Sequence, residues 1–394
     1  MQFFDKAKAM EDQLTEWRRD IHMHPELGFE ETRTARKVAD TLRGWGMEVE
    51  VGVGITGVVA RIGDSSEGRS IGIRADMDAL PIDEDNDVPY KSQTPGIMHA
   101  CGHDAHTAIL LGVAKMLNEM EDRPRGEIRF LFQPSEEKWD KELKSGATRM
   151  IDDNALEDLD SVIALHVSSF LPSGTVVIGD GHMLAAVDSF TAVIKGEGCH
   201  GASPHMGIDP VWMQAQVINA IQAIRSRWLT PLAPSVITVG SIHGGSAPNV
   251  IPHEVTLIGT IRSYDEEIRD QLHEELATAL SLVKTWGGDY TLDIERGYPA
   301  LYNDPNVADV IRMVGTETVG DENLPQAQAS MGAEDFAFMT KKAPGAMFFL
   351  GAKMDEVNRP HHSPIFDIDE KALPVGAAVL AETAVRLLKG EDVQ

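Results

Sequence analysis

Residues 98–107 read Met-His-Ala-Cys-Gly-His-Asp-Ala-His-Thr, and an apolar run of helical length follows at 108–117. The pattern predicts a turn that carries soft ligands and opens a helix. Cys101 and His103 are one residue apart, so in an extended turn both can reach one ion, and thiolate and imidazole suit zinc and similar divalent ions. The alternative is a buried cysteine beside helix-capping polar residues. The chain has only two cysteines, and the position of one in this His-rich turn favours a metal-binding or catalytic role.

The composition is that of a large acidic protein. The 394 residues are 42% hydrophobic and 25% charged, which suffices for a large core and two domains. The formal net charge is -27 and no basic patch stands out, so we expect neither a nucleic acid nor a membrane surface as partner. Two cysteines form no disulfide framework and suit a reducing compartment. The chain lacks the order of a signal peptide and an apolar run of membrane-spanning length, so we expect a soluble cytoplasmic protein.

Polar side chains follow three strand-like apolar segments at the points where these segments end. Strands and helices alternate here, which predicts an α/β sheet, and ligands of such sheets bind outside the carboxyl ends of the strands. The segments are 70–78, which ends in Asp76 and Asp78, 127–132, which precedes Glu136 and Glu137, and 161–165, which ends before His166. We expect these five side chains to face one crevice beside Cys101 and His103.

Residues from about 5 to 45 read as helical, and Pro25 interrupts them. The segment 22–28, His-Met-His-Pro-Glu-Leu-Gly, has two imidazoles close together and is a second candidate for metal binding. The alternative, which we favour, is a capped polar helix end.

The pattern changes near residue 188. The order of the next segments is β-α-β-β-α-β, the ferredoxin-like motif, at 189–194, 210–225, 235–242, 254–262, 265–286 and 290–294. After Pro299 the α/β character returns, with a helix at 306–318, a buried strand at 346–350 and a final helix at 374–389. We therefore predict a larger domain made of residues 1–187 and 299–394, with a smaller domain inserted at 188–298.

Glu136 and Glu137 follow an apolar strand and a proline turn, where neighbouring side chains diverge. One of them can bind metal while the other faces the substrate water as a general base. Glutamate is a weak base at neutral pH because its pKa lies far below that of water. A metal ion reduces the difference between the two pKa values, because it makes the bound water more acidic. The alternative is a solvated pair of carboxylates without a catalytic role.

A set of motifs runs in order over nearly the whole chain, at 74–81, 98–107, 132–137, 165–166, 249–252, 259–263, 330–336 and 362–364. Each motif alone is weakly specific, but together they resemble the metal-dependent amidohydrolases of the M20 peptidase family. The resemblance is closest to the branch of hippurate hydrolases, N-acyl-amino-acid deacylases and plant auxin-conjugate hydrolases.

The resemblance implies a zinc-peptidase-type, three-layer α/β catalytic domain with an inserted ferredoxin-like α+β dimerisation or lid domain, in agreement with the division above. Glu136 resembles the general base, and Asp78 the acid behind the ligands that orients an imidazole. Asp76 stands where many relatives have a ligand histidine. Two divalent ions per subunit, zinc, manganese, cobalt or nickel, would be held by Cys101, His103, Glu137, His166 and His362.

The inserted domain has its own matches to the family. Asn249 and Arg262 resemble residues that hold the substrate, and Arg262 suits a carboxylate because its fork can bind it bidentately. Gly332 resembles a residue that lines the pocket. His200 stands at the family's catalytic histidine, which often stabilises the oxyanion in the partner subunit's site, so a homodimer or a dimer of dimers is implied. Cys199 beside it is unusual, and we favour a packed small residue over a redox-sensitive thiol.

We therefore expect a metallo-amidohydrolase or carboxypeptidase that acts on N-acyl amino acids or on the C-terminal residue of short peptides. Metal-activated water would attack the amide carbonyl, and Glu136 would pass the proton to the leaving amine. Two alternatives remain: a thiol hydrolase with Cys101 as nucleophile and His103 as base, and a catalytically silent homologue that only binds metal or ligand. No motif encodes the preferred acyl group or amino acid.

Overall fold

The computed structural model describes residues 2–392, and the chain forms two compact units. The first unit is built from Met1–Gly181, Tyr302–Gln328 and Phe338–Gln394, and the second from His182–Leu301 and Ala329–Ala337. Three short elements lie where the chain passes between the units: β7 (Gly181–Leu184), β14 (Leu301–Asn303) and α9 (Phe336–Thr340). Every helix in residues 2–392 is too short or too polar to span a lipid bilayer.

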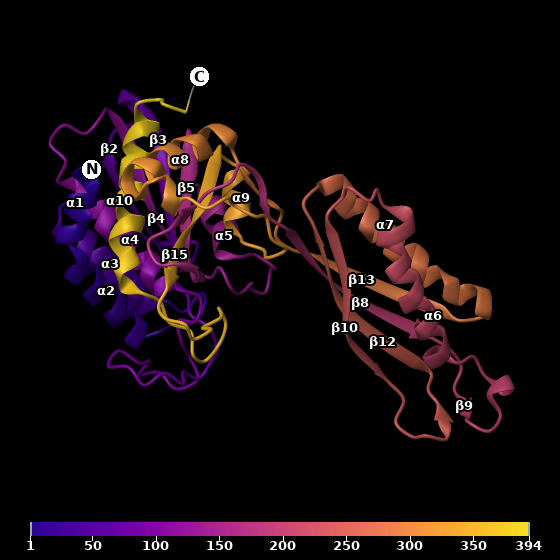
Figure 1. Ribbon diagram of the computed structural model, residues 1–394. Helices are drawn as coiled ribbons and strands as arrows, with labels where there is room; N and C mark the ends of the chain where they lie inside the picture. The colour runs from indigo at the N-terminus through magenta and orange to yellow at the C-terminus, as the bar shows by residue number, and fades with distance from the viewer. Residues whose placement is uncertain (1, 393–394) are drawn as a thin grey trace. The chain divides into compact units, whose positions relative to one another are not determined.

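A seven-stranded sheet forms the centre of the first unit, in the order β1-β2-β4-β3-β5-β15-β6 (Figure 1). The inner strands β4, β3, β5 and β15 run parallel, and the other three pair antiparallel with their neighbours. β3 and β4 are buried along nearly their whole length, as is typical of parallel strands. The strands are β1 Glu48–Val53, β2 Gly57–Gly63, β3 Arg69–Asp76, β4 Gly126–Gln133, β5 Ser161–Pro172, β6 Val176–Val177 and β15 Gly345–Lys353.

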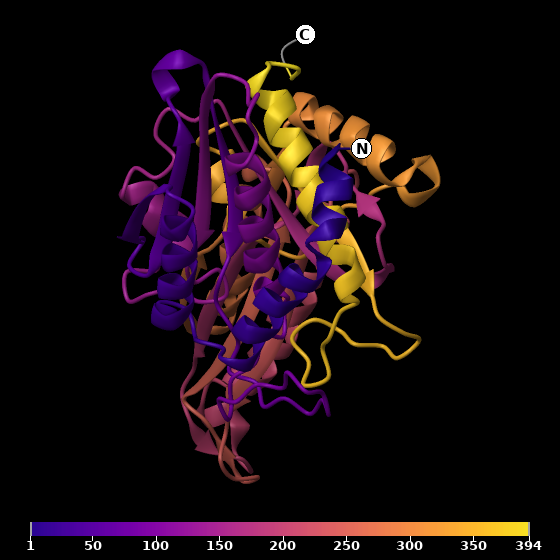
Figure 2. The ribbon, with the colours of Figure 1, turned by 90° about the vertical axis from the view of Figure 1, so that its left-hand side faces the viewer.

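Helices cover this sheet. α4 and α10 pack on β3 and β5, and α3 packs beside α4 on β1 and β2. α1 and α2 pack on α4 and α10, and Figure 2 shows these indigo helices beside the yellow α10. The helices are α1 Gln2–Ala9, α2 Glu11–Met23, α3 Thr32–Gly44, α4 His103–Asn118, α5 Gly146–Asp152, α8 Pro305–Val319 and α10 Leu373–Leu388, with short 3-10 turns at Ser65–Glu67, Asp321–Asn323 and Glu370–Ala372.

The second unit is a four-stranded antiparallel sheet, in the order β10-β12-β8-β13, on which α6 and α7 pack. The chain order is β8-α6-β10-β12-α7-β13, so the predicted ferredoxin-like motif is confirmed. β9 and β11 form a separate two-stranded sheet at one end of the unit (Figure 1). The elements are β8 Ala186–Lys195, β9 Cys199–His200, Pro204–Met206 (3-10), α6 Pro210–Ala223, Ile224–Trp228 (π), β10 Ser235–Gly244, β11 Val250–Ile251, β12 Glu254–Ser263, α7 Glu266–Ser281, Leu282–Trp286 (3-10) and β13 Asp289–Arg296.

Most of the local structure follows the predictions, but the helix predicted at 265–286 becomes a 3-10 turn after Ser281. The predicted break at Pro25 is confirmed, since α2 ends at Met23 and α3 begins at Thr32. The strand predicted to end before His166 instead continues to Pro172, because β15 pairs with it in parallel from Val162 to Ser168 and, after a bulge, again at Pro172.

Candidate metal centre

The predicted side chains of the first unit converge at the carboxyl ends of its parallel strands. They come from the ends of β3 and β4, from β5, from the turn before α4 and from the loop after β15. Their donor atoms form three overlapping groups, and the atoms of each group lie within 4.8 Å of one another: Cys101–His103–His166, Cys101–Glu137–His362 and His103–Glu136–Glu137. Cys101 belongs to two groups, so one sulfur can reach two ions. A mixed set of sulfur, nitrogen and oxygen donors suits zinc and related transition metals.

Asp78 connects two of these side chains. Its Oδ1 accepts a hydrogen bond from His103 Nδ1 (3.0 Å), and its Oδ2 accepts one from the backbone N–H of Glu137 (3.0 Å). The Nε2 atom of His103 is buried and has no hydrogen-bond partner among the described residues. A buried nitrogen without a partner is unfavourable, so His103 fits a metal ligand. Burial alone would lower the pKa of His103, but Asp76 and Asp78 raise it to about 10, which shows that this place favours positive charge.

Two further imidazoles face the sulfur of Cys101. His166 donates from Nδ1 to the carbonyl of Val167 (2.7 Å), and this orients its Nε2 toward Sγ at 3.5 Å. His361 accepts a hydrogen bond from Ser169 N at Nε2 (3.4 Å), so its Nδ1 carries the proton, 3.7 Å from Sγ. His361 therefore fits a hydrogen-bond donor to a thiolate. Its role was not predicted from the sequence, although it stands beside the predicted ligand His362.

The protonation of Cys101 depends on the charge in the centre. Burial, followed by the carboxylates of Glu137 and Glu136, raises the pKa of the Cys101 thiol well above its ordinary value. A divalent ion reverses this effect, because a coordinating thiol is deprotonated. The donor set therefore fits a site that is completed by cations.

Asp76 is fully buried, and both of its oxygens have partners. Oδ2 accepts from Arg74 Nη1 (2.7 Å) and Oδ1 accepts from His106 Nδ1 (2.6 Å). His106 Nε2 in turn accepts from the backbone N–H of Val167 (2.9 Å). This chain of contacts joins β3, α4 and β5. Asp76 Oδ2 also lies 3.7 Å from His103 Nε2, and Asp76, His103 and His106 form a further group of donor atoms that lie within 4.8 Å of one another.

His362 and Glu137 form an ion pair, with Nε2 and Oε1 2.9 Å apart, and this contact raises the pKa of His362. His362 has a φ of +61°, which is uncommon for a residue other than glycine. Its backbone N–H donates to the carbonyl of Ala100 (2.8 Å). The left-handed backbone thus places the imidazole next to the turn that carries Cys101, and such conformations concentrate at functional sites.

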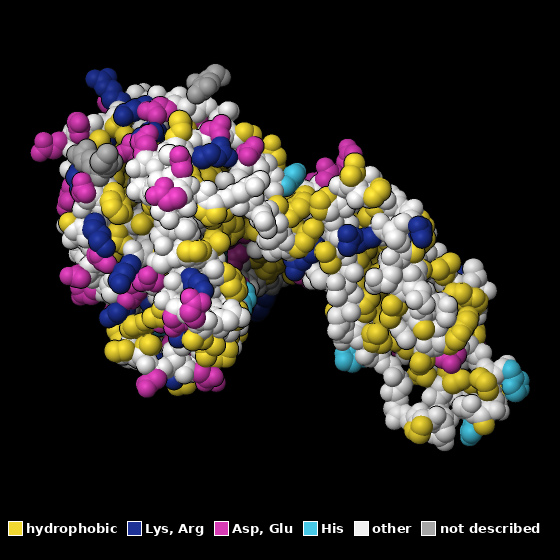
Figure 3. Space-filling view, viewed as in Figure 1, with side chains coloured by type: hydrophobic (Ala, Val, Ile, Leu, Met, Phe, Trp, Pro, Cys, Tyr) yellow, Lys and Arg dark blue, Asp and Glu magenta, His cyan; other side chains and the backbone are white. Residues whose placement is uncertain are grey.

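The second unit contains two neighbouring predicted residues at one end. His200 in β9 pairs with Val250 in β11, and the N–H of Gly201 donates to the carbonyl of Asn249 (2.8 Å). His200 and Asn249 are both exposed. Figure 3 shows histidine side chains gathered at this end of the unit.

Arg262 lies near the opposite end of β12. Glu254, at the start of β12, pairs with Lys195 near β9, whereas Arg262 pairs with Val187 at the beginning of β8. Burial lowers the pKa of Arg262, and the attraction of the nearby Asp188 partly offsets this effect. Gly332 belongs to the same unit, where its carbonyl accepts from the N–H of Ala185 (2.8 Å).

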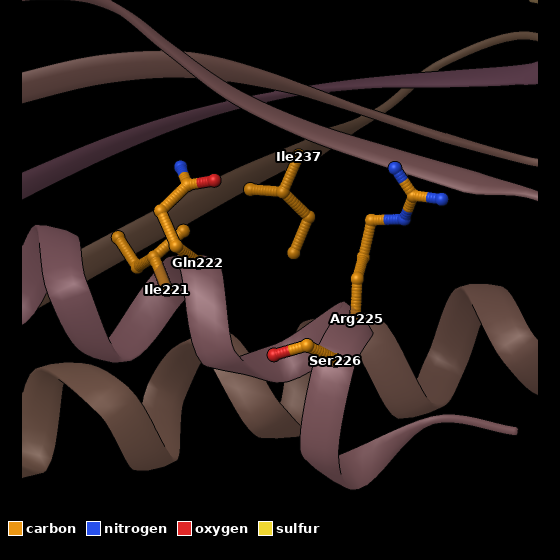
Figure 4. A pocket seen from close by; sticks show the side chains of 5 residues that line it. All are labelled: Ile221, Gln222, Arg225, Ser226 and Ile237. Carbon is orange, nitrogen blue, oxygen red and sulfur yellow. The ribbon is translucent and has the colours of Figure 1, made fainter. Parts of the chain in front are cut away.

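A pocket of about 320 Å³ in the second unit is a different feature, lined by Ile221, Gln222, Arg225, Ser226 and Ile237. In Figure 4, Gln222 and Arg225 extend from the helical segment toward the strands on either side of Ile237. The lining residues carry no carboxylate, thiol or imidazole. This pocket therefore lacks the groups that activate water.

Comparisons with known proteins agree with this geometry. The family model described as Peptidase family M20/M25/M40 matches residues 72–386. Thermostable carboxypeptidase 1 of Saccharolobus solfataricus is 39% identical over 385 residues, 96% of each chain. N-acetyl-L-cysteine deacetylase of Bacillus subtilis is 40% identical over 391 residues, 98% of this chain and 90% of that protein. The crystal structure of Bacillus subtilis YXEP protein, described as a dinuclear metal binding peptidase from the M20 family, has a TM-score of 0.84 at 32% identity, covering 97% of this chain and 99% of that one.

Proposed function

Since the chain belongs to peptidase family M20/M25/M40, we propose that it is a metal-dependent hydrolase of N-acyl amino acids or of the C-terminal peptide bond of short peptides. A carboxypeptidase and an N-acetyl-L-cysteine deacetylase are among its similar proteins, and both names fall in this substrate class. The observation that carries the proposal is the place of Cys101 in two donor groups beside the Glu136–Glu137 pair.

In this proposal Cys101 would help to hold two divalent ions. One would be held with His103 and His166, and the other with Glu137 and His362, as the two donor groups suggest. A similar structure is described as dinuclear, which supports two ions here. When bound, the ions would polarise the amide carbonyl and lower the pKa of the attacking water.

Glu136 is the general base in this proposal. The backbone N–H of Glu137 is fixed by Asp78, so the direction of the peptide between the two glutamates is fixed as well. Glu137 contacts His362, and in this proposal its neighbour Glu136 takes the proton from water and returns it to the leaving amine. Asp78 also fixes the ring of His103, which leaves Nε2 toward the donor groups.

Arg262 binds the free carboxylate of the substrate in this proposal. A partly buried guanidinium is unfavourable in the free protein, and a substrate carboxylate would satisfy its donors in a bidentate contact. Asn249 would contribute a further polar contact, and Gly332 would line the pocket.

The positions within the second unit support a homodimer. Glu254 and Arg262 are eight residues apart along β12, and at about 3.3 Å per residue this separates Arg262 from the β9–β11 end by roughly 26 Å. A small substrate cannot contact both ends of one unit. We therefore infer that His200 and Asn249 complete the site of the partner subunit, where His200 stabilises the oxyanion.

The thiol-hydrolase alternative receives little support. The Sγ atom of Cys101 contacts His166 and His361, while His103 donates to Asp78. The raised pKa of the Cys101 thiol also opposes a free thiolate nucleophile.

A chelation experiment tests the proposal. The protein is stripped of metal, reloaded with Zn²⁺, Mn²⁺, Co²⁺ or Ni²⁺, and assayed with N-acetyl, N-benzoyl and indole-acetyl amino acids and with dipeptides. We expect hydrolysis that disappears on stripping and returns with at least one metal. Activity that survives complete removal of metal would favour the thiol hydrolase, and inactivity with every metal and substrate would favour a silent homologue.

A further inference from the structure

The segment 24–31 between α2 and α3 packs against two of the strand ends that carry the metal centre. The backbone N–H of Ala79 donates to the carbonyl of Glu26 (2.9 Å), and Leu27 forms a β-bridge with Ala79, directly after Asp78. Glu31, at the other end of the segment, reaches the turn after β4. This segment overlaps residues 22–28, the second candidate for metal binding in the sequence, and it contacts the backbone on which the site is built.

The side chain of Glu31 is fully buried, with 0% exposure, and two groups donate hydrogen bonds to its carboxyl oxygens. Its Oε1 accepts a hydrogen bond from the backbone N–H of Ser135 (2.8 Å), and its Oε2 accepts one from the hydroxyl of Thr56 (2.5 Å). Ser135 is the residue immediately before Glu136 and Glu137. Burial and the nearby Asp78 raise the pKa of Glu31 to about 7, and the hydrogen bonds from Thr56 and the Ser135 backbone favour its charged form.

Ser135 is held in an unfavourable conformation. It has a φ of +44°, and its hydroxyl donates to the carbonyl of Lys138 (2.7 Å). Its own carbonyl accepts from the N–H of Gly146 (2.8 Å). A left-handed serine persists only where its surroundings fix it, and Glu31 supplies one of these restraints.

Gly28 supplies a second restraint through close approach. A Cβ atom at this position would lie 2.3 Å from Ser135 Oγ, which no real structure tolerates without movement. The segment 24–31 therefore fixes Ser135 from two directions, by a hydrogen bond and by packing.

We propose that Glu31 is a positioning residue for the catalytic pair: its hydrogen bond to Ser135 N holds the turn that sets the geometry of Glu136 and Glu137. The proposal rests on the proposed hydrolase function only for its effect on turnover. Glu31 does not touch the substrate or the reacting atoms in this role, so its loss acts on the rate and on the geometry of the metal site more than on substrate affinity.

The test compares Glu31→Ala and Glu31→Gln with Glu26→Ala in the full-length protein. Glu26 is the matched control, because its carboxylate also accepts backbone N–H groups, but those of Arg33 and Thr34 at the start of α3 (both 2.8 Å). The measurements are kcat and KM on the best substrate, the thermal midpoint, and the visible absorption spectrum after loading with Co²⁺.

Glu31→Ala should lower kcat by about 10- to 100-fold, because small displacements of catalytic groups have effects of this size, with KM changed less than threefold and an altered cobalt spectrum. Glu31→Gln should restore most of kcat, since its amide oxygen can accept from Ser135 and its amide nitrogen can donate to Thr56. Glu26→Ala should lower the thermal midpoint while kcat and the spectrum stay near those of the wild type. Equal effects of Glu31→Ala and Glu26→Ala on kcat and spectrum would overturn the proposal.

If Glu31→Ala does not fold, a second variant tests the role of the Ser135 turn. Gly28→Ala leaves the carboxylate in place but must displace Ser135. We expect the same decrease in kcat and the same change in the cobalt spectrum, and an unchanged spectrum would contradict the role of the Ser135 turn. If the wild type hydrolyses no substrate, the proposed function fails. The cobalt spectra then test by themselves whether Glu31 determines the geometry of the metal site.

Discussion

Single hydrogen bonds determine which atoms of the histidines face the metal centre. His103 donates from Nδ1 to Asp78, and His166 donates from Nδ1 to a backbone carbonyl, so both present the lone pair of Nε2 to the donor groups. His361 has the opposite arrangement, because Ser169 N occupies its Nε2 and leaves Nδ1–H toward Cys101. Residues next to the proposed ligands thus orient each imidazole.

Glu136→Gln should abolish turnover while the metal content stays near that of the wild type. The substitution removes the proposed base but leaves Glu137 and its contact with His362 intact. Loss of a general base should lower kcat by about 100- to 10,000-fold or more. Activity assays together with elemental analysis of the purified variant check this. Loss of metal would show that Glu136 is a ligand and that the two roles are exchanged.

Arg262→Ala should lower kcat/KM for substrates with a free α-carboxylate by about 30-fold or more, the effect expected when one partner of a hydrogen-bonded charge pair is removed. The kcat/KM for α-carboxamide analogues should change little. Arg225→Ala, which removes an exposed guanidinium of the same unit, serves as the control. Parallel losses on acids and amides would mean that Arg262 does not bind the carboxylate.

His22 makes the stability of the fold depend on pH. It contacts Asp104 through Nδ1 (2.8 Å) and Glu84 through Nε2 (3.3 Å), and although burial lowers its pKa, these two carboxylates raise it to about 9. The unfolded value is about 6.5. Protonated His22 therefore stabilises the folded state fully below about pH 6.5, and this contribution is lost as the pH rises through about 9.

Urea denaturation of the wild type and His22→Gln from pH 6 to 10 checks this dependence. The difference in unfolding free energy between them should shrink by on the order of 3 kcal/mol over this range. His24→Gln is the control, since its half-exposed ring bonds to the backbone carbonyl of Asp20. A difference for His22→Gln that is as constant as that of the control would contradict the assignment.

At the scale of elements, the start of α4 depends on Gly102 between Cys101 and His103. Gly102 has a φ of +96°, and a Cβ atom here would lie 2.3 Å from Val167 Cγ2. Gly102→Ala should lower the unfolding free energy by about 2–5 kcal/mol, the sum of left-handed strain and overpacking. Metal affinity should fall by roughly 10- to 100-fold, as expected when support of ligands is lost.

Gly174→Ala is the matched control for Gly102→Ala. Gly174 has a similar φ of +80°, but no atom lies within 4 Å of the position of its Cβ. This variant should show the left-handed strain alone, about 1–2 kcal/mol, with unchanged metal affinity. Urea denaturation and metal titration measure both effects. Equal metal affinities of the two variants would contradict the importance of the turn at Gly102.

The strands and helices were predictable where one local pattern determined them. Continuous apolar runs identified β3 and β4, and the turn at 98–107 identified the start of α4. The end of β5 was not predictable, because its last residues are held by β15, which is remote in the sequence. The role of His361 was not predictable for the same reason, because it depends on Ser169, which lies 192 positions away in the chain.

At the scale of the molecule, the order of elements predicted the ferredoxin-like unit, since each of its strands and helices has its own periodicity. The sequence did not indicate that residues 329–337 join this unit. They do so through backbone hydrogen bonds, such as that from Ser330 N to the carbonyl of Met183 (2.9 Å). Backbone pairing of this kind does not depend on the side chains, so it cannot be predicted from the sequence pattern. The sequence also did not predict that His200 and Arg262 lie at opposite ends of the unit, because this follows only from the register of β8 and β12.

That separation leads to a prediction about assembly. If His200 acts in the partner's site, Glu136→Gln and His200→Ala homodimers are both inactive, but a mixed dimer contains one site with both residues intact. A two-fold interface repeats each contact, so each mixed dimer should regain up to half of the wild-type rate. The two proteins are dissociated, mixed, re-paired and assayed. Mixing Glu136→Gln with His103→Ala is the control, because both residues belong to the same unit and no mixed dimer contains an intact site. Recovery in the first mixture alone supports sharing across the dimer, whereas mixed dimers that form and remain inactive would show that His200 serves its own subunit.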